Sequence, residues 1–112
     1  MTTDIEPPAA ITEYFTRLND ADKRGAIKVF SPDAVVTDDG HTYRGREEIL
    51  RWLGSAAGEY SFTSTRLSTR ITGATVTVTT RLEGNFPGGI VDQRNIFTLD
   101  AAGLITSLLI TV

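Results

Sequence analysis

The spacing of apolar residues changes along the chain from a helical period to a strand period. Before residue 60, apolar side chains recur every three or four positions, as in Ile11, Tyr14, Phe15 and Leu18, which is the spacing of an amphipathic helix. From Tyr60 onward, apolar and polar residues tend to alternate, as in a strand with one buried face. This order predicts an α+β fold, in which the helices cover one face of a mainly antiparallel sheet.

Three helices are predicted before residue 60. The first follows a pair of prolines, and the second is shorter and begins after an acidic capping segment. We expect the second helix to bury Phe30 and to end at 31–33, which contains a proline. The third helix is predicted over 44–53. Between the second and third helices, 34–38 is typical of a short strand, and an Asp-Gly turn ends it.

Four strands are predicted after the helices, over 60–72, 74–86, 90–100 and 103–112. Gly-rich or Pro-containing segments separate them at the spacing of hairpins. The first of these strands changes phase within itself, so its apolar residues do not share one face. A bulge near 64–66 would restore the phase and bend the sheet.

The last two predicted strands are apolar on both faces, although an open antiparallel sheet needs only one buried face. Either the rest of the chain covers the second face, or a second subunit does. Because no predicted element is left to cover it, we favour a homodimer. The outer face that would form the interface contains Ile90, Ile96, Ile105 and Leu109.

Composition removes several kinds of chemistry. The 112 residues include no Cys and a single His, His41, which excludes disulfides, thiolate nucleophiles and zinc sites built from several such ligands. The net charge is −3 without any basic run, so nucleic-acid binding is not indicated. No apolar stretch approaches the ~20 residues of a membrane span, and the N-terminus lacks the pattern of a signal peptide. We therefore expect a single cytoplasmic domain over residues 1–112, with no metal and no cofactor.

Four local motifs resemble those of the nuclear-transport-factor-2-like superfamily, in the same order and over nearly the whole chain. They are YFTRLNDAD at 14–22, IKVFSPDAVV at 27–36, YRGREEI at 43–49 and FTLDAAGLI at 97–105. The resemblance implies three N-terminal helices packed on a strongly curved sheet, a cone-shaped fold with an internal apolar pocket. Many members dimerise through the outer face of the sheet. Because this fold carries enzymes, transport factors and assembly domains alike, the motifs are more specific for fold than for function.

Asp38 is the strongest candidate for chemistry in such a pocket. Adjacent strand residues point to opposite faces, and the alternation of Ala34 and Val36 places Asp38 on the helix-covered side. Burial against apolar walls disfavours a charged carboxylate and so makes it a better general base. The alternative is that Asp38 only caps the turn at Asp39-Gly40.

Asp38, Tyr14 and Asn95 together are most similar to the catalytic set of ketosteroid isomerase, in the SnoaL-like branch of the superfamily. The resemblance implies that Asp38 moves a proton between carbons while Tyr14 and Asn95 hydrogen-bond the substrate oxygen. Asn95 departs from that enzyme, where an acid occupies the equivalent position. As alternatives, Tyr14 is a core aromatic residue, and Asn95 is a buried amide satisfied by neighbouring backbone.

The resemblance also implies an apolar ligand, whose pocket walls would be Phe15, Trp52, Leu53, Tyr60, Val78, Phe86 and Phe97. For each of these residues, ordinary core packing is the alternative role. His41 lies in a polar turn and is predicted to be exposed. Overall, the sequence predicts a small-molecule pocket protein, with an isomerase-type reaction on a carbonyl compound as the sharpest hypothesis. A non-catalytic ligand-binding protein and a dimeric assembly module are the alternatives.

Overall fold

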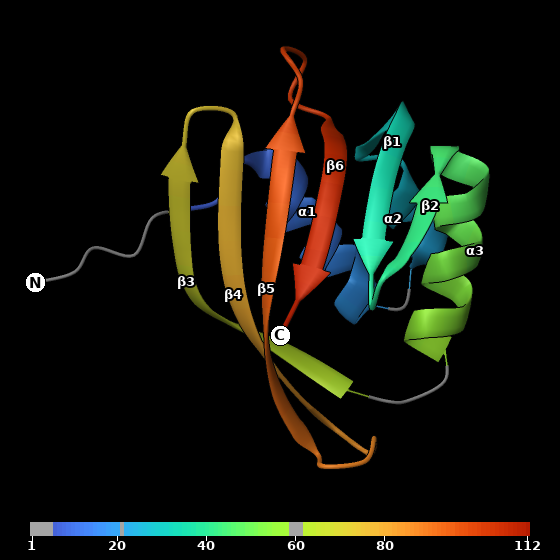
Figure 1. The fold of residues 1–112 in the computed structure, drawn as a ribbon, viewed down its shortest axis with the longest axis vertical. Helices are drawn as coiled ribbons and strands as arrows, with labels where there is room; N and C mark the ends of the chain where they lie inside the picture. The colour runs from blue at the N-terminus through green and yellow to red at the C-terminus, as the bar shows by residue number, and fades with distance from the viewer. Residues whose placement is uncertain (1–5, 21, 59–61) are drawn as a thin grey trace, which may run out of the picture.

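The computed structural model describes residues 6–20, 22–58 and 62–112 (Figure 1). The helices are α1 (Ala9–Asn19), α2 (Lys23–Ile27) and α3 (Gly45–Gly58). The strands are β1 (Phe30–Asp38), β2 (His41–Arg44), β3 (Phe62–Thr72), β4 (Thr75–Gly84), β5 (Ile90–Leu99) and β6 (Ile105–Thr111). The predicted α+β class and the order of the elements are therefore confirmed.

The six strands form one open, mixed sheet in the order β2-β1-β6-β5-β4-β3. Strands β1 and β6 pair in parallel, and all other neighbours are antiparallel. In Figure 1, α1 and α2 lie behind the sheet, and α3 lies beside the β1–β2 edge. The buried core, which includes Ile11, Phe30, Val36, Phe97 and Leu108, lies between the helices and the inner face of the sheet.

The predicted boundary between the second helix and the first strand is wrong. Phe30 begins β1 instead of ending a helix, and the proline segment lies inside the strand. A central strand accepts proline only where it need not donate to a neighbour. Here the pairing with β6 is interrupted between Phe30 and Val35, so Pro32 stands in an irregular, unpaired stretch and is exposed.

Two further elements, β2 and α3, differ from the prediction. Strand β2 was not predicted, because none of its residues except a half-buried Tyr43 is apolar. It pairs with β1 through the predicted turn, in which Asp39 and Gly40 both have positive φ, 53° and 77°. That combination is the two-residue hairpin turn that matches the twist of a sheet. His41 is exposed, as predicted. Helix α3 continues to Gly58, beyond its predicted end at residue 53.

Two irregularities in strand pairing decide which residues face the helices. In β3 the register with β4 shifts between Arg66 and Ser68, which confirms a bulge close to the predicted one. In β6 the partner of Thr98 is Ser107 and the partner of Leu99 is Ile105, which leaves Thr106 as an extra residue.

The prediction that Ile105 lies on the outer face is wrong. The irregularity at Thr106 reverses the alternation in β6, so the side chain of Ile105 is fully buried in the core. Leu109 remains on the outer face with 43% of its surface exposed, beside half-buried Ile96, and Ile90 is 60% exposed.

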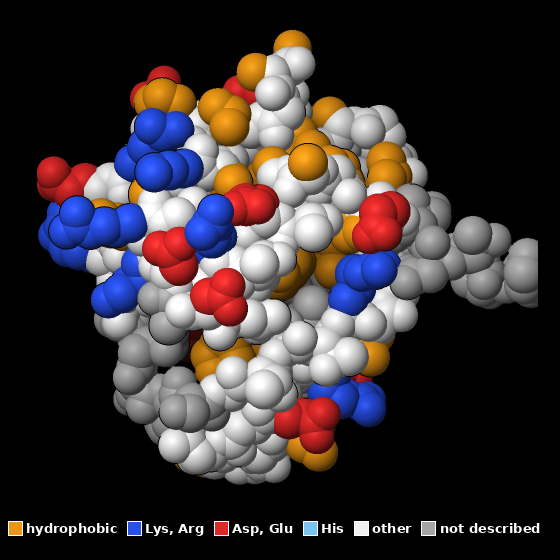
Figure 2. Space-filling view, turned by 180° about the vertical axis from the view of Figure 1, so that it is seen from behind, with side chains coloured by type: hydrophobic (Ala, Val, Ile, Leu, Met, Phe, Trp, Pro, Cys, Tyr) orange, Lys and Arg blue, Asp and Glu red, His pale blue; other side chains and the backbone are white. Residues whose placement is uncertain are grey.

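The face opposite the view of Figure 1 is the one that carries the helices. Basic and acidic side chains are interspersed over it, with apolar groups between them (Figure 2). In the part of the chain that the structure describes, no helix is long and apolar enough to span a bilayer.

Candidate functional site

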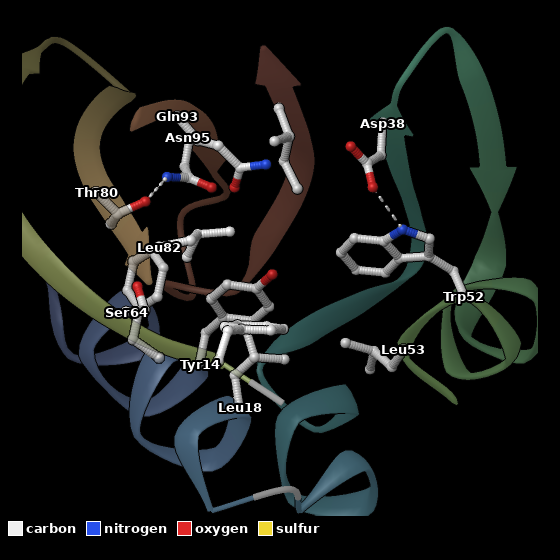
Figure 3. Close-up of a pocket in the computed structure, with 13 residues that line it drawn as sticks. Tyr14, Leu18, Asp38, Trp52, Leu53, Ser64, Thr80, Leu82, Gln93 and Asn95 are labelled. Atoms are coloured by element: carbon white, nitrogen blue, oxygen red, sulfur yellow. Dashed lines mark hydrogen bonds between the residues drawn. The ribbon is translucent and has the colours of Figure 1, made fainter. Parts of the chain in front are cut away.

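A partly open cavity of about 120 Å³ lies between α1, α3 and the inner face of the sheet (Figure 3). Its apolar lining consists of Phe15, Leu18, Trp52, Leu53, Phe62, Leu82 and Ile110. Its polar lining consists of Tyr14, Asp38, Ser64, Thr80, Gln93 and Asn95. A mostly apolar cavity with a few polar groups is the usual form of a small-molecule site.

Strand register brings the polar groups of the cavity together. Asp38 pairs with Ile110, and Ile110 pairs with Asn95, so the three residues form one row across β1, β6 and β5. Gln93 lies two residues before Asn95 and therefore on the same face of β5. Because neighbouring strands are about 4.8 Å apart, the backbones at Asp38 and Asn95 are separated by roughly 10 Å.

Asp38 is half-buried at the end of β1 and accepts a hydrogen bond from a helix. The indole N–H of Trp52 donates to Asp38 Oδ2 at 3.1 Å. Trp52, which is 5% exposed, also contacts the ring of Tyr43 at a centroid distance of 6.1 Å. The hydrogen bond fixes the orientation of the carboxylate and leaves Oδ1 without a partner among the described residues.

Tyr14 is held by aromatic neighbours and directs its hydroxyl into the cavity. Its ring makes edge-to-face contacts with Phe15, Phe30 and Phe97 at centroid distances of 5.0, 5.7 and 5.7 Å. Figure 3 shows the hydroxyl pointing toward the space between β5 and Asp38. Burial, with a smaller effect of the Asp38 charge, raises the pKa of Tyr14 well above its usual value. The phenol is therefore a stable hydrogen-bond donor.

Asn95 uses its amide hydrogens within the protein. The side chain is 3% exposed, and its nitrogen donates to the Val78 carbonyl and to Thr80 Oγ1, each at 3.0 Å. A carbonyl can only accept, so Val78 determines which end of the amide faces it. Since an amide nitrogen carries two hydrogens, no donor on Asn95 remains free for a ligand.

The predicted wall residues divide into those on the cavity and those elsewhere. Phe15, Trp52 and Leu53 line the cavity. Val78 and Phe97 are fully buried in the core, and Phe86 lies beyond the end of β4. Tyr60 lies outside the described residues.

Sequence reasoning missed several polar groups of the cavity, notably Gln93, Ser64 and Thr80. Gln93 could have been predicted from the sequence, because it lies two positions before Asn95 and therefore on the same face of the strand. The role of Trp52 as a donor to Asp38 was also missed. The sequence signal for this hydrogen bond was the tryptophan itself, because a buried indole N–H usually needs an acceptor.

The cavity offers no cluster of metal ligands. Among the residues that the structure describes, no three acidic or His side chains lie close enough together to hold a metal ion. The cavity therefore places one fixed carboxylate, that of Asp38, across an apolar space from neutral hydrogen-bond donors.

Comparison with solved structures finds proteins of similar fold. A candidate polyketide cyclase from Sinorhizobium meliloti is 31% identical, with a TM-score of 0.89 over 94% of this chain and 95% of that chain. A Δ5-3-ketosteroid isomerase from Mycobacterium sp. is 23% identical, with a TM-score of 0.78 over 93% of this chain and 90% of that chain.

A protein from Mycobacterium tuberculosis, in complex with estradiol-17β-hemisuccinate, is 19% identical, with a TM-score of 0.79 over 92% of this chain and 90% of that chain. At these identities, the isomerase and the estradiol complex show a shared fold. A search of curated proteins gave no match.

The family model described as SnoaL-like domain matches residues 11–108, which is most of the chain. The match extends from α1 into β6 and includes every residue that lines the cavity except Ile110. The resemblance to the nuclear-transport-factor-2-like superfamily is thereby confirmed, and the chain belongs to the SnoaL-like domain family.

Proposed function

We propose that this protein is an enzyme that moves a proton on an apolar carbonyl compound, with Asp38 as the base and Tyr14 as a hydrogen-bond donor to the carbonyl oxygen. The observation that carries the proposal is that the Asp38 carboxylate and the Tyr14 hydroxyl face the same cavity. Among the described residues, the Tyr14 hydroxyl has no hydrogen-bond partner, so a ligand oxygen can take that place.

The proposed reaction uses the two oxygens of Asp38 differently. Trp52 stays on Oδ2 and holds the carboxylate, while Oδ1 removes a proton from the carbon next to the carbonyl. The electron pair of that C–H bond moves to the carbonyl oxygen and forms an enolate. Tyr14 stabilises the negative oxygen, and protonated Asp38 then returns the proton to the same or another carbon. Loss of one such donor costs about 100- to 1,000-fold in rate.

Cavity size limits the part of the substrate that enters. The cavity holds about 120 Å³, and an apolar protein cavity of roughly 150 Å³ accepts benzene. The enclosed part of the substrate is therefore about one ring in size, and a larger molecule would extend through the open side. The similarity to a candidate polyketide cyclase and to a ketosteroid isomerase supports a cyclic ketone.

The sequence predicted Asn95 as a second direct donor, and the proposal changes that role. Because both Asn95 hydrogens are used, Asn95 acts as a positioning residue that holds Thr80 and the backbone of β4.

Proton exchange into a small ketone tests the proposal without knowledge of the natural substrate. Cyclohex-2-enone is incubated with the protein in deuterated water, and loss of its exchangeable C–H signals is followed by proton NMR. Wild type should accelerate exchange over buffer, Asp38→Asn should abolish the acceleration, and Tyr14→Phe should reduce it about 100-fold or more. Asp39→Asn is the matched control, because Asp39 is the exposed neighbour in the turn.

The alternative of ligand binding without catalysis predicts a different result in the same experiment. In that case 4-nitrophenol, an enolate mimic, would bind in the cavity, but wild type and Asp38→Asn would leave the exchange rate of the ketone at the buffer value. That outcome would contradict the proposed reaction.

We also propose a homodimer formed through the outer face of the sheet. Leu109 and Ile96 are register neighbours at the centre of that face, and Leu109 is 43% exposed. Ile90, 60% exposed, lies on the same face of β5 near its start. Exposed apolar groups on a sheet face that none of the described helices covers support contact with a second copy.

A further inference from the structure

Gln93 is a cavity residue to which the proposed reaction gives no task. It lies on β5, is half-buried, and lines the cavity with Tyr14 and Asp38. In Figure 3 its amide points into the space that the Tyr14 hydroxyl and the Asp38 carboxylate also face. Among the described residues, its side chain has no hydrogen-bond partner. An amide in this position has two donors available to a ligand.

The neighbouring residues do not need Gln93 to hold the wall. Thr80 is the register partner of Gln93 on β4, and its hydroxyl already accepts a hydrogen bond from Asn95. Asn95, on the same face of β5, is fully engaged with Val78 and Thr80. Of the two amides on this face, one therefore maintains the wall and the other is free.

The position of Gln93 suits an oxygen that Tyr14 also contacts. Asp38 is two strands away from β5 across Ile110, so a ring placed between them can turn the carbon next to its carbonyl toward Asp38 and the carbonyl oxygen toward β5. In that orientation the carbonyl oxygen meets the Tyr14 hydroxyl and the Gln93 amide. Because an amide is neutral, it donates without any change in protonation state.

We propose that Gln93 is the second hydrogen-bond donor to the substrate oxygen, together with Tyr14, and that Asn95 serves only to position the wall. The inference rests on the proposed function, because it assigns the oxygen end of the same reaction. The ligand class is a ring ketone or its enolate, whose oxygen accepts one hydrogen bond from a phenol and one from an amide.

Binding of 4-nitrophenol tests the assignment, since its phenolate resembles the enolate in shape and charge. Isothermal titration compares wild type with Gln93→Met, which keeps the length of the side chain but cannot donate a hydrogen bond. Gln93→Met should weaken binding about 10-fold or more, as expected for a hydrogen bond to a charged group.

Arg94→Met is the matched control, because Arg94 lies next to Gln93 on the outer face of β5 and is exposed. It should bind as wild type does. Unchanged affinity in Gln93→Met would overturn the assignment. If Tyr14→Phe loses affinity while Gln93→Met does not, the Gln93 inference fails and the proposed function stands.

If wild type binds no 4-nitrophenol, the proposed function fails together with the inference. A second readout does not depend on how well the variants fold. The side-chain amide protons of Gln93 in wild-type protein should shift in the nitrogen–proton NMR spectrum when 4-nitrophenol is added, and those of Asn95 should shift less. The reverse order would contradict the inference.

Discussion

Two amides on one face of β5 show how neighbouring residues of similar chemistry take different roles. Asn95 is buried and donates twice to β4, whereas Gln93 is half-buried and faces the cavity without a partner among the described residues. The difference follows from position. The Asn95 side chain is only 3% exposed, so an unpaired polar group there would be costly, whereas half-buried Gln93 lies where a ligand or water can pair with it.

Stability measurements distinguish the two amides. Asn95→Leu should lower the free energy of unfolding by about 1–3 kcal/mol, because it leaves the buried Val78 carbonyl and Thr80 hydroxyl without their donor. Gln93→Met, as the comparison, should change it by less than about 0.5 kcal/mol. Urea unfolding measures both. Equal losses in the two variants would contradict the division of roles.

Tyr14 links the cavity to the pH dependence of stability. Its pKa is raised in the folded protein, mainly by burial and further by Asp38. In the unfolded chain the phenol ionises near its ordinary value of about 10, while the folded protein still keeps the proton. The unfolded state therefore binds fewer protons above about pH 10, and the free energy of unfolding falls as pH rises.

Tyr14→Phe should remove this part of the alkaline destabilisation. Urea unfolding of wild type and variant is compared at about pH 8 and about pH 11, and the wild type should lose more stability over that interval. An identical loss in both proteins would show that Tyr14 ionises normally. Tyr43→Phe is the comparison, because Tyr43 lies outside the cavity on β2.

At the scale of elements, the short helix α2 depends on its cap. Asp22 precedes the helix, accepts a hydrogen bond from the Gly25 N–H at 2.9 Å and forms an ion pair with Arg17 at 3.0 Å. A Cβ added at Gly25 would overlap Asp22 Oδ2 and lie 2.8 Å from Arg17 Cδ. The glycine is therefore needed for close approach of the cap and of α1.

Paired glycine substitutions test this account of the cap. Gly25→Ala should destabilise the protein by about 1–2 kcal/mol, since the cap must move. Gly54→Ala, within α3, should stabilise it by about 0.5–1 kcal/mol, because the nearest atoms, on Lys23, are 3.6 Å or more from the added Cβ. Thermal or urea unfolding gives both values. A gain in stability for Gly25→Ala would contradict the close-contact argument.

At the scale of the whole molecule, the outer face of the sheet is covered by none of the helices that the structure describes (Figure 1). Its central row, Thr37, Leu109, Ile96, Thr77 and Arg70, follows from the register of five strands. Apolar groups occupy the middle of the row, and polar groups occupy both ends. That distribution matches an interface with an apolar centre and a polar rim.

Light scattering of wild type and Leu109→Asp tests the proposed dimer. Wild type should have about twice the mass of one chain, and Leu109→Asp should be a monomer, because it buries an unpaired charge at the interface. Leu50→Asp is the control, at a residue that is 36% exposed and belongs to helix α3 instead of the sheet. A monomeric wild type would contradict the dimer.

Local patterns in the sequence determined the order of elements, because a helical period and a strand alternation are properties of neighbouring residues. They also predicted that Asp38 points inward and that Asp39-Gly40 turns the chain, and both predictions agree with the structure. The likeness of four motifs to one superfamily indicated the fold, which the family match confirms.

Only the tertiary structure decided which residues meet. The extra residue Thr106 turns Ile105 into the core, and an irregular pairing lets Pro32 lie inside β1. The alternation of apolar and polar residues reveals neither feature, because a bulge changes the phase of a strand without requiring a particular residue type. The hydrogen bonds that Asn95 donates, and the hydrogen bond from Trp52 to Asp38, join residues that are 14 to 17 positions apart in the chain. Sequence spacing does not determine such contacts.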